Sequence, residues 1–294
     1  MQLPGLALIE SDLRNTIESQ IRRSGIMYRL FSRVKEQYSI EEKIERKGYT
    51  NSEKLMQDIV GFRIVTYFND DVKTLYNFFE KFFSGSVGVY DNPNADQFKP
   101  LRKNLICPFD EYNLKIFNDI KIVENIFEYV DCTFEVQFRT TFSEGWHEIE
   151  HAMRYKCVDE WTLLDDESRM LNGIYASLET NDHSLKSLFD DIAYKHYKSG
   201  NWTGMLRNKF RMKFKLGVLD VNLSYLFDSN QRLAKEILKI DRNDLLTTIL
   251  NRQIRMNISL ENIVYLCNYI YIQDENIFRY TPQILIDDFN TYLS

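Results

Sequence analysis

The stretch CTFEVQFRT, residues 132–140, decides the fold. Its β-branched and aromatic residues predict a strand. Side chains alternate between the two faces of a strand, so Glu135, Gln137 and Arg139 are expected on one face and Val136 and Phe138 on the other. This pattern predicts a sheet that is packed on one side and carries reactive polar groups on the other. An antiparallel strand with an ordinary solvated face is the alternative.

The composition indicates a globular protein with sizeable cores, because 44% of the 294 residues are hydrophobic and 14% are aromatic. The four cysteines are scattered without a C-x-x-C pair, which favours a reducing compartment and argues against a disulfide framework. We find no signal peptide and no apolar run of the ~18 residues that a membrane span needs. We therefore expect a cytoplasmic protein with no membrane contact. The net charge of −6 does not suggest overall nucleic-acid binding.

The remaining chain pattern predicts helices around two strands. In chain order we expect a helix over 6–31, a helix begun by a capping box of Ser39 and Glu42 and ended by Gly48, a short helix from Thr50 to Asp58, a strand GFRIVTYF over 61–68, a helix over 70–83, loop over 84–111, and helices from Phe142 onward. Such an order predicts an α+β domain followed by a helical one. We place these domains at 1–190 and 191–294, the second with a basic segment at 195–215.

Charged residues near the first strand suggest a phosphate site. Asp58 lies at the entry to this strand and Glu135 on the other strand, and two such carboxylates can hold Mg²⁺, which commonly bridges protein and substrate phosphates. Arg33 and Lys35 precede the next helix, on which Lys43, Arg46 and Lys47 share one face. A cationic face beside a metal carboxylate suits a triphosphate. An ordinary solvated face is the alternative, because several glutamates neighbour these cations.

Four motifs occur in an order that resembles a known family. They are R-x-K-x-x-x-S-x-x-x-K (Arg33, Lys35, Ser39, Lys43), D-I-V-G-F-R (58–63), E-V-Q-F-R-T (135–140) and W-x-x-I-E-H-x-x-x-Y-K (146–156). Together they resemble the RelA/SpoT-type alarmone synthetase domain over roughly residues 10–190. The resemblance implies a nucleotidyltransferase-like mixed sheet flanked by helices. It also implies an ATP-dependent transferase that moves the β,γ-pyrophosphate of ATP to a ribose 3′-hydroxyl, usually that of GDP or GTP.

The resemblance also implies roles for individual residues. Asp58 and Glu135 would hold Mg²⁺, and Glu135 would help to activate the attacking hydroxyl. The ATP-binding set would comprise Arg33, Lys35, Ser39, Lys43, Arg46 and Arg63, with Arg33 and Arg63 flanking the adenine. Gln137, Arg139, Glu150, His151 and Lys156 would line or brace the site. Phosphoryl-type transfer depends mainly on positioning and charge neutralisation, so a metal and several cations suffice.

One family motif is missing. Members that use a guanine acceptor carry a G-Y-x-S-x-H loop before the E-x-Q-x-R-T strand, whereas this chain has FKPLRKNLICPF at 98–109. The donor half of the site is therefore predicted to be intact and the acceptor half to be altered. This difference favours another acceptor nucleotide, or a tRNA 3′ end as in some toxic small synthetases. A catalytically silent nucleotide-binding module is a second hypothesis, although a pure binder needs no pair of metal carboxylates.

The segment HEIEH (147–151) also fits H-E-x-x-H, a helical zinc-protease signature. A zinc-dependent hydrolase would need a third ligand, and His183, His196 and Glu179 fall in no recognisable ligand motif. The synthetase motif explains more of this stretch, including Trp146 and Lys156. We therefore favour the synthetase interpretation.

The basic segment near the C-terminal domain contains KFRMKFKL (209–216), in which cations and apolar residues alternate. A phosphate-contacting RNA patch of Lys209, Arg211, Lys213 and Lys215 is one hypothesis. A solvated edge paired with acidic neighbours is the alternative, and we favour it.

Overall fold

The computed structural model describes residues 4–90 and 103–293. The chain divides into two compact units. The sheet unit comprises Met1–Glu18, Tyr28–Tyr67 and Leu75–Thr180, and the helical unit comprises Ser19–Met27, Phe68–Thr74 and Asn181–Ser294. The domain boundary expected after residue 190 stays a prediction.

The sheet unit is built on a mixed five-stranded sheet. Its strand order is β1 (Tyr28–Val34), β2 (Val60–Thr66), β5 (Thr133–Thr140), β4 (Lys103–Pro108) and β3 (Val87–Tyr90). β2 and β5 pair in parallel, and the other neighbours pair antiparallel. The predicted fold class, a mixed sheet flanked by helices with a helical C-terminal region, is confirmed.

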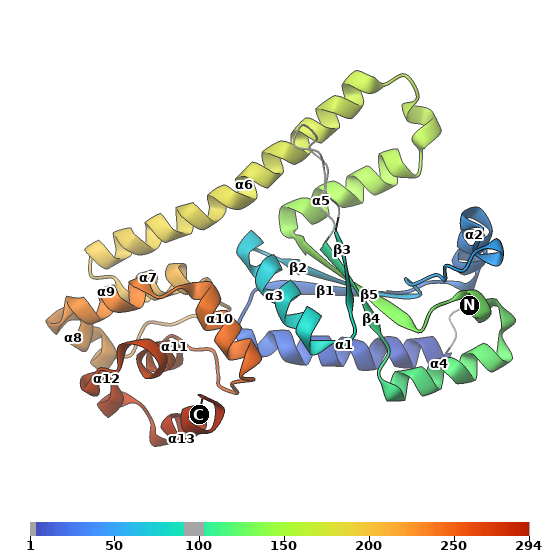
Figure 1. The fold of residues 1–294 in the computed structure, drawn as a ribbon. Helices are drawn as coiled ribbons and strands as arrows, with labels where there is room; N and C mark the ends of the chain where they lie inside the picture. The colour runs from blue at the N-terminus through green and yellow to red at the C-terminus, as the bar shows by residue number, and fades with distance from the viewer. Residues whose placement is uncertain (1–3, 91–102, 294) are drawn as a thin grey trace. The chain divides into compact units, whose positions relative to one another are not determined.

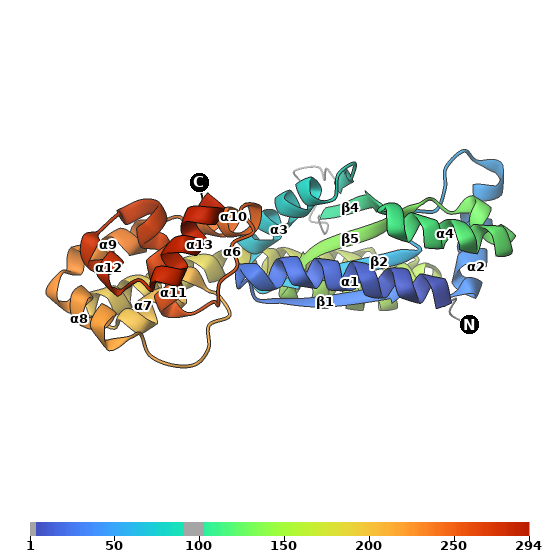
Figure 2. The same cartoon turned by 90° about the horizontal axis from the view of Figure 1, so that it is seen from below.

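The two faces of the sheet differ as the alternation in β5 predicts. Phe134, Val136 and Phe138 are almost fully buried, whereas Glu135 and Gln137 are partly exposed. On the buried face, Phe79 of α3 (Asn69–Phe82) contacts Phe138 at a ring-centroid distance of 6.2 Å. Helices α1 (Pro4–Ser24) and α4 (Glu111–Val123) also lie on this side (Figures 1 and 2). Helix α5 (Thr141–Glu150) covers the opposite, polar face (Figure 1).

Other helical segments complete the sheet unit. They are α2 (Gln37–Lys47), the 3₁₀ turns Tyr49–Asn51, Asn125–Tyr129 and Val158–Trp161, a π-helical turn His151–Tyr155, and the first part of α6 (Asp165–Lys198). The C-terminal end of α2 is confirmed, because Gly48 caps it in the left-handed conformation with φ 65°. A glycine tolerates that conformation without a Cβ clash.

Several local predictions are wrong. The helix expected over 6–31 ends at Ser24, because Gly25 turns the chain with φ 71° and β1 follows. The predicted capping box is absent: α2 begins after Glu36, two residues before Ser39. Between Thr50 and Asp58 the chain forms the end of a 3₁₀ turn and an isolated β-bridge at Met56, in place of a helix.

The prediction that 84–111 is loop throughout is wrong, because this segment contributes strands β3 and β4 to the sheet. Leu105 and Cys107 of β4 are fully buried, and the strand pairs with β5 from Asn104 to Pro108. Tertiary pairing overrides the local turn residues here. Residues 98–102 of the altered acceptor interval lie outside the described residues.

The helical unit consists of short capped helices. After the second part of α6 come α7 (Trp202–Phe210), α8 (Val221–Ser229), α9 (Gln231–Lys239), α10 (Arg242–Asn251), α11 (Leu260–Cys267), α12 (Glu275–Tyr280) and α13 (Gln283–Leu293), with a π-helical turn at Asn268–Ile272. Side chains such as Asp220, Asp241 and Ser259 accept hydrogen bonds from the first turns of these helices. No helix in the described part of the chain is long and apolar enough to cross a membrane.

A buried arginine cluster joins four residues of the helical unit: Asp70, Asp71, Arg211 and Arg242. Arg242 Nη1 and Nη2 donate to the two carboxylate oxygens of Asp71 at 2.6 and 3.1 Å. Arg211 donates to both oxygens of Asp70 at 3.1 and 2.7 Å. Arg211 is 3% exposed, so its inclusion in a phosphate-contacting RNA patch is wrong. Lys213 and Lys215 are exposed, in irregular backbone that forms neither a strand nor a helix.

Candidate active site

The polar face of the sheet carries two rows of side chains. Phe31 lies opposite Arg63 in the pairing of β1 and β2, Arg63 lies opposite Gln137, and Gln137 lies opposite Asn104. In the adjacent row, Gly61 lies between Arg33 and Glu135. Residues that lie opposite one another on paired strands project to the same face. The register therefore brings together residues that are far apart in the sequence.

A cavity of about 550 Å³ opens over this face. It is lined by Phe31, Ser32, Arg33, Asp58, Gly61, Phe62, Arg63, Glu135, Gln137, Glu144 and Glu148. Five of the predicted site residues thus line one cavity: Arg33, Asp58, Arg63, Glu135 and Gln137. Strands β1, β2 and β5 form its floor, and α5 supplies the two glutamates.

Two lysines contact Asp58. Lys35 Nζ lies 2.8 Å from Oδ2, and Lys43 Nζ lies 2.6 Å from Oδ1. Burial raises the pKa of Asp58, but the two ammonium groups outweigh burial and hold this pKa below its usual range. Burial lowers the pKa of Lys35, and the Asp58 carboxylate only partly offsets this effect. Lys35 and Lys43 thus join the predicted site through Asp58.

Glu135 is held by two amide groups. Asn104 Nδ2 donates to Oε1 at 2.7 Å, and Gln137 Nε2 donates to Oε2 at 2.9 Å. A carboxylate oxygen has room for more than one partner, so each oxygen can still accept a proton or bind a cation. Glu135 is therefore fixed in orientation while its oxygens stay usable at the cavity.

Arg63 connects the sheet to α5. Its Nε donates to Gln137 Oε1 at 3.2 Å, and its Nη1 donates to Glu144 Oε1 at 2.5 Å and to Glu148. Arg139 Nε lies 3.6 Å from Glu144 Oε2. Burial, reinforced by the neighbouring Arg63 charge, lowers the pKa of Arg139 to about 10. The guanidinium of Arg63 is thus held in place by three acceptors.

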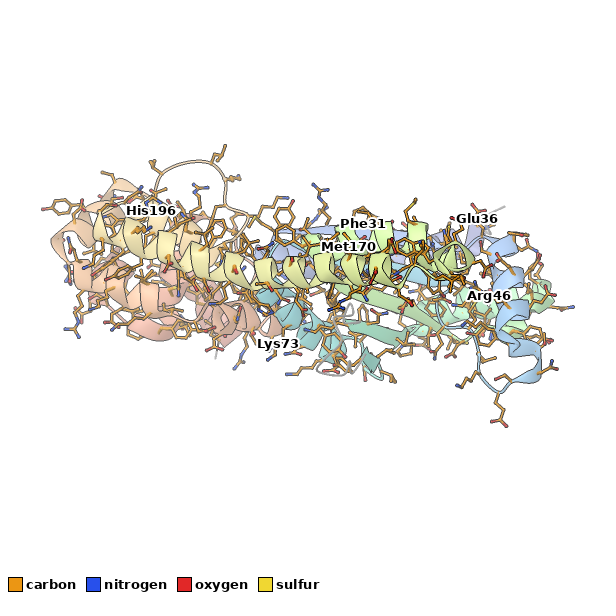
Figure 3. All side chains as sticks on the ribbon, turned by 90° about the horizontal axis from the view of Figure 1, so that it is seen from above. Phe31, Glu36, Arg46, Lys73, Met170 and His196 are labelled. Atoms are coloured by element: carbon orange, nitrogen blue, oxygen red, sulfur yellow. The ribbon has the colours of Figure 1, made fainter. Side chains whose placement is uncertain are left out.

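The other predicted residues do not line the cavity. Glu150 accepts from Arg154 Nε at 3.4 Å, and the His151 ring stacks on Tyr155 at 5.3 Å. Ser39 and Arg46 lie on α2, where Arg46 is exposed (Figure 3), and Lys156 is exposed beyond the π-helical turn. Roles for these five residues stay predictions.

Among the described residues, His147 and His151 do not form part of a larger metal cluster. Burial, with the charges of Arg139 and Arg63, lowers the pKa of His147 to about 3, so this ring is neutral near pH 7. Its centroid lies 5.7 Å from that of His151. Within residues 4–90 and 103–293 there is no group of three or more His, Cys, Asp or Glu side chains placed to hold a metal ion. The third ligand that a zinc hydrolase requires is not found among them.

A family comparison covers the segment that supplies all the residues lining this cavity except Phe31. Residues 32–160 match the family model described as a region found in RelA / SpoT proteins. Residues 32–160 are therefore similar to a region of RelA/SpoT proteins. The resemblance predicted from the four motifs is therefore confirmed over these residues, which are less than half of the chain. No curated protein matches the chain significantly.

Solved structures with similar folds include three bacterial proteins. Small alarmone synthetase 1 from Bacillus subtilis is 18% identical, with 63% of this chain and 92% of that chain covered and a TM-score of 0.43. A GTP pyrophosphokinase family protein from Streptococcus pneumoniae is 24% identical, with 64% and 91% covered and a TM-score of 0.44. Small alarmone synthetase 2 from Bacillus subtilis is 21% identical, with 62% and 92% covered and a TM-score of 0.43.

Four residues that line this cavity or contact its lining are not predicted from the sequence: Phe31, Asn104, Glu144 and Glu148. Glu144 and Glu148 contact Arg63 across 81 and 85 residues of sequence, and Asn104 contacts Glu135 across 31. The sequence pattern predicts Phe31 at the end of a helix, whereas it lies in β1. A signal for the glutamates did exist, because they lie four residues apart and so share one face of the predicted helix. Nothing in the local sequence indicated Asn104.

Proposed function

We propose that the RelA/SpoT region transfers pyrophosphate from ATP to the 3′-hydroxyl of a nucleotide or of a tRNA 3′ end in a Mg²⁺-dependent reaction. One observation carries this proposal: a single cavity joins Asp58 and Glu135 with Arg33 and Arg63, all from the segment that matches RelA/SpoT proteins. Carboxylates and cations on one wall suit a metal-bound triphosphate. We place the reaction in the cytoplasm, where ATP is available.

The carboxylates of the cavity fit Mg²⁺ by their chemistry. Asp58 and Glu135 both line it and offer oxygen ligands, which Mg²⁺ prefers. A bound Mg²⁺ would neutralise phosphate charge and polarise the phosphoryl group. Mg²⁺ usually takes only one or two protein carboxylates and completes its shell with water and substrate phosphates. Two carboxylates are therefore enough, and a cluster of three is not required.

The cations of the site have separate tasks in this proposal. Lys35 and Lys43 are held at Asp58, where they would neutralise the phosphates of ATP. Arg33 faces the same cavity, and Ser39 and Arg46 of α2 extend the proposed ATP-binding set. Because the chemistry needs charge neutralisation more than covalent catalysis, these fixed cations would supply much of the rate enhancement.

The proposed reaction forms one bond and breaks another. The acceptor 3′-oxygen bonds to the β-phosphorus of ATP, and the bond from that phosphorus to the oxygen bridging to the α-phosphate breaks, so that AMP leaves. Glu135 receives the hydroxyl proton. The hydrogen bonds from Asn104 and Gln137 fix the orientation of its carboxylate for this step. Glu150 would support the site indirectly, by holding Arg154. Arg154 Nε donates to Glu150, and Arg154 Nη1 donates to Asn172 Oδ1 at 3.1 Å.

The test is a transfer assay with an acceptor panel. Purified full-length chain, Mg²⁺ and ATP labelled at the γ-phosphate are incubated with GDP, GTP, adenine nucleotides and tRNA. We expect label on one acceptor with release of AMP, and a loss of roughly 100- to 10,000-fold for Glu135→Gln, the contribution of a general base. If label stays on ATP for every acceptor, or if Glu135→Gln transfers normally, the proposal is wrong. ATP binding without turnover would favour a silent binding module.

A further inference from the structure

The connection between α7 and α8, residues 211–220, presents apolar side chains to solvent. Figure 2 shows this connection, which we call the α7–α8 loop, projecting from the helices of the helical unit. Leu216 is 97% exposed and Val218 is 81% exposed. Val221 and Tyr225, which lie four residues apart on α8, are also exposed. Several large apolar side chains that are exposed together mark a surface that contacts another molecule.

The α7–α8 loop is anchored at both ends in the helical unit. Met212 and Leu219 are buried. The backbone N–H of Lys213 donates to the carbonyl oxygen of Gly25 at 2.7 Å, and the backbone N–H of Leu219 donates to Thr203 Oγ1 at 2.8 Å. The exposed residues between these anchors are therefore held in a defined position at the surface.

Arg207 supports the tip of the loop. Its Nη2 donates to the carbonyl oxygen of Gly217 at 2.9 Å, and both of its Nη atoms lie 3.4 Å from the carbonyl oxygen of Lys215. Arg207 thus binds the backbone on both sides of Leu216, whose own side chain is left in solvent. A tip that is already ordered loses little conformational entropy when it contacts a partner.

The chain around the loop is basic, although the whole protein carries a net charge of −6. No Asp or Glu occurs between Asp191 and Asp220, and Lys213 and Lys215 beside the apolar tip are exposed. Asp220 ends this run as the N-cap of α8, where its carboxylate accepts two backbone N–H groups. Exposed charges more than about 8 Å away are largely screened at physiological ionic strength, so the nearby lysines decide what the loop attracts. A partner surface with negative charge is expected.

The residue types of the loop distinguish between anionic partners. RNA is bound by aromatic side chains on which bases stack, whereas this tip is aliphatic. Protein interfaces are enriched in aromatic residues and Arg and depleted of Lys. A bilayer with anionic headgroups accepts aliphatic side chains among its acyl chains, while lysine ammonium groups reach the lipid phosphates. Leu216 and Val218 next to two lysines fit the bilayer best.

We propose that the α7–α8 loop contacts the surface of a membrane that contains anionic lipid. Leu216 and Val218 insert among the acyl chains, and Lys213 and Lys215 lie at the headgroup phosphates. Tyr225 lies at the membrane–water interface, where tyrosine is enriched. Such a contact needs no spanning helix. It differs from the sequence-based expectation of no membrane contact, which rested on the lack of a spanning segment.

Co-sedimentation of the purified full-length chain with lipid vesicles tests the contact. We expect binding to vesicles of phosphatidylcholine mixed with phosphatidylglycerol, and little binding to phosphatidylcholine alone. Leu216→Ala should weaken binding to the mixed vesicles roughly 10- to 50-fold, because less apolar surface is buried. Lys213→Gln and Lys215→Gln should each weaken it about fivefold, the contribution of one lysine near an anionic surface.

The matched controls lie in the sheet unit. Leu163→Ala removes the same apolar group from a 92% exposed position, and Lys54→Gln removes an exposed charge. Both should bind the mixed vesicles within about twofold of wild type, because neither residue belongs to the loop. Urea denaturation checks that the loop variants are as stable as wild type, as expected for exposed side chains.

Three results would overturn the proposal: no binding of the wild-type chain to mixed vesicles, equal binding to both kinds of vesicle, or the same loss for Leu163→Ala as for Leu216→Ala. If the chain ignores vesicles but binds tRNA, and Lys213→Gln weakens that binding, the loop is an RNA contact and the proposal is wrong. Vesicle binding is measured without ATP or acceptor. Its outcome is therefore independent of whether the transfer reaction occurs.

Discussion

The lysine–aspartate contacts of the sheet unit and the buried arginine cluster of the helical unit both join aspartates to cations, but their geometry differs. Asp58 is contacted by two lysines that each provide one contact, and its side chain is 27% exposed at a cavity. Asp71 is fully buried and receives a two-pronged contact from Arg242. A lysine contact is easily exchanged for a phosphate, whereas a planar guanidinium bound at two points is not.

The charges around Asp58 are thus suited to binding a ligand, whereas those of the buried arginine cluster stabilise the fold. Removing one partner of a buried pair leaves an uncompensated charge without water, which is costly. Removing a partner at a hydrated cavity costs little stability, because water can replace the contact. We therefore expect the two regions to respond to substitution in opposite ways.

The largest expected effect is on stability. Arg242→Met removes the partner of Asp71 and the donor to the Phe210 carbonyl oxygen, so we expect the free energy of unfolding to fall by about 3–5 kcal/mol. Urea denaturation measures this change. Lys239→Met is the control, because Lys239 makes an exposed ion pair with Glu236 and should change stability by less than about 0.5 kcal/mol. Equal effects of the two substitutions would contradict the distinction.

The second prediction concerns the cavity side. Asn104→Leu removes one of the two amides that orient Glu135, so we expect kcat for transfer to fall roughly 10- to 100-fold, as for other residues that orient a catalytic or metal carboxylate. The free energy of unfolding should change much less than in Arg242→Met. Asn113→Leu is the matched control: Asn113 is buried but donates to Asp12 at 2.9 Å outside the cavity lining, so it should lower stability without lowering kcat.

The smallest expected effect is a pH dependence. Burial raises the pKa of Asp70, but Arg211 and Arg242 outweigh burial and hold this pKa below its ordinary value of 3.8. A carboxyl group whose pKa is lower in the folded state stabilises the fold above its unfolded pKa, and this stability is lost as pH falls through the folded pKa. We expect Asp70→Asn to be less stable than wild type by about 1.5 kcal/mol near pH 6, the size of a hydrogen bond to a charged group.

This stability gap should narrow as the pH falls below about 3.8, where Asp70 starts to become protonated in the unfolded chain. Chemical denaturation at a series of pH values measures the gap. Asp190→Asn, in an exposed pair with Lys186, provides a nearly flat reference. If the stability difference between wild type and Asp70→Asn stays constant from pH 6 to pH 3, the charge of Asp70 does not contribute to the stability of the fold.

The sequence was most informative where a pattern repeats locally. The alternation in β5 predicted which residues lie on the polar face of the sheet, because a strand repeats every two residues whatever its neighbours are. β1 was missed because the spacing of its apolar residues continues that of α1, and only Gly25 marks the change. Local pattern reveals such a junction poorly when a single glycine is its marker.

Contacts between residues far apart in the sequence are not predictable from it, for a different reason. Asn104 lies in a segment flanked by turn-forming residues, and it becomes a partner of Glu135 only because β4 pairs with β5 in one register. The glutamates of α5 acquire their role from the distance between that helix and the sheet. Composition and periodicity carry no information on the register of β4 against β5 or on the distance between α5 and the sheet.

The alternation in β5 also limits how this gene segment can change over evolution. Substitutions at Glu135 or Phe138 alter one face and leave the other intact. A deletion or insertion of a single residue would instead exchange the two faces, placing carboxamide and guanidinium groups in the aromatic core and phenylalanines at the cavity. We therefore expect related genes to vary in sequence along this strand while its length stays constant.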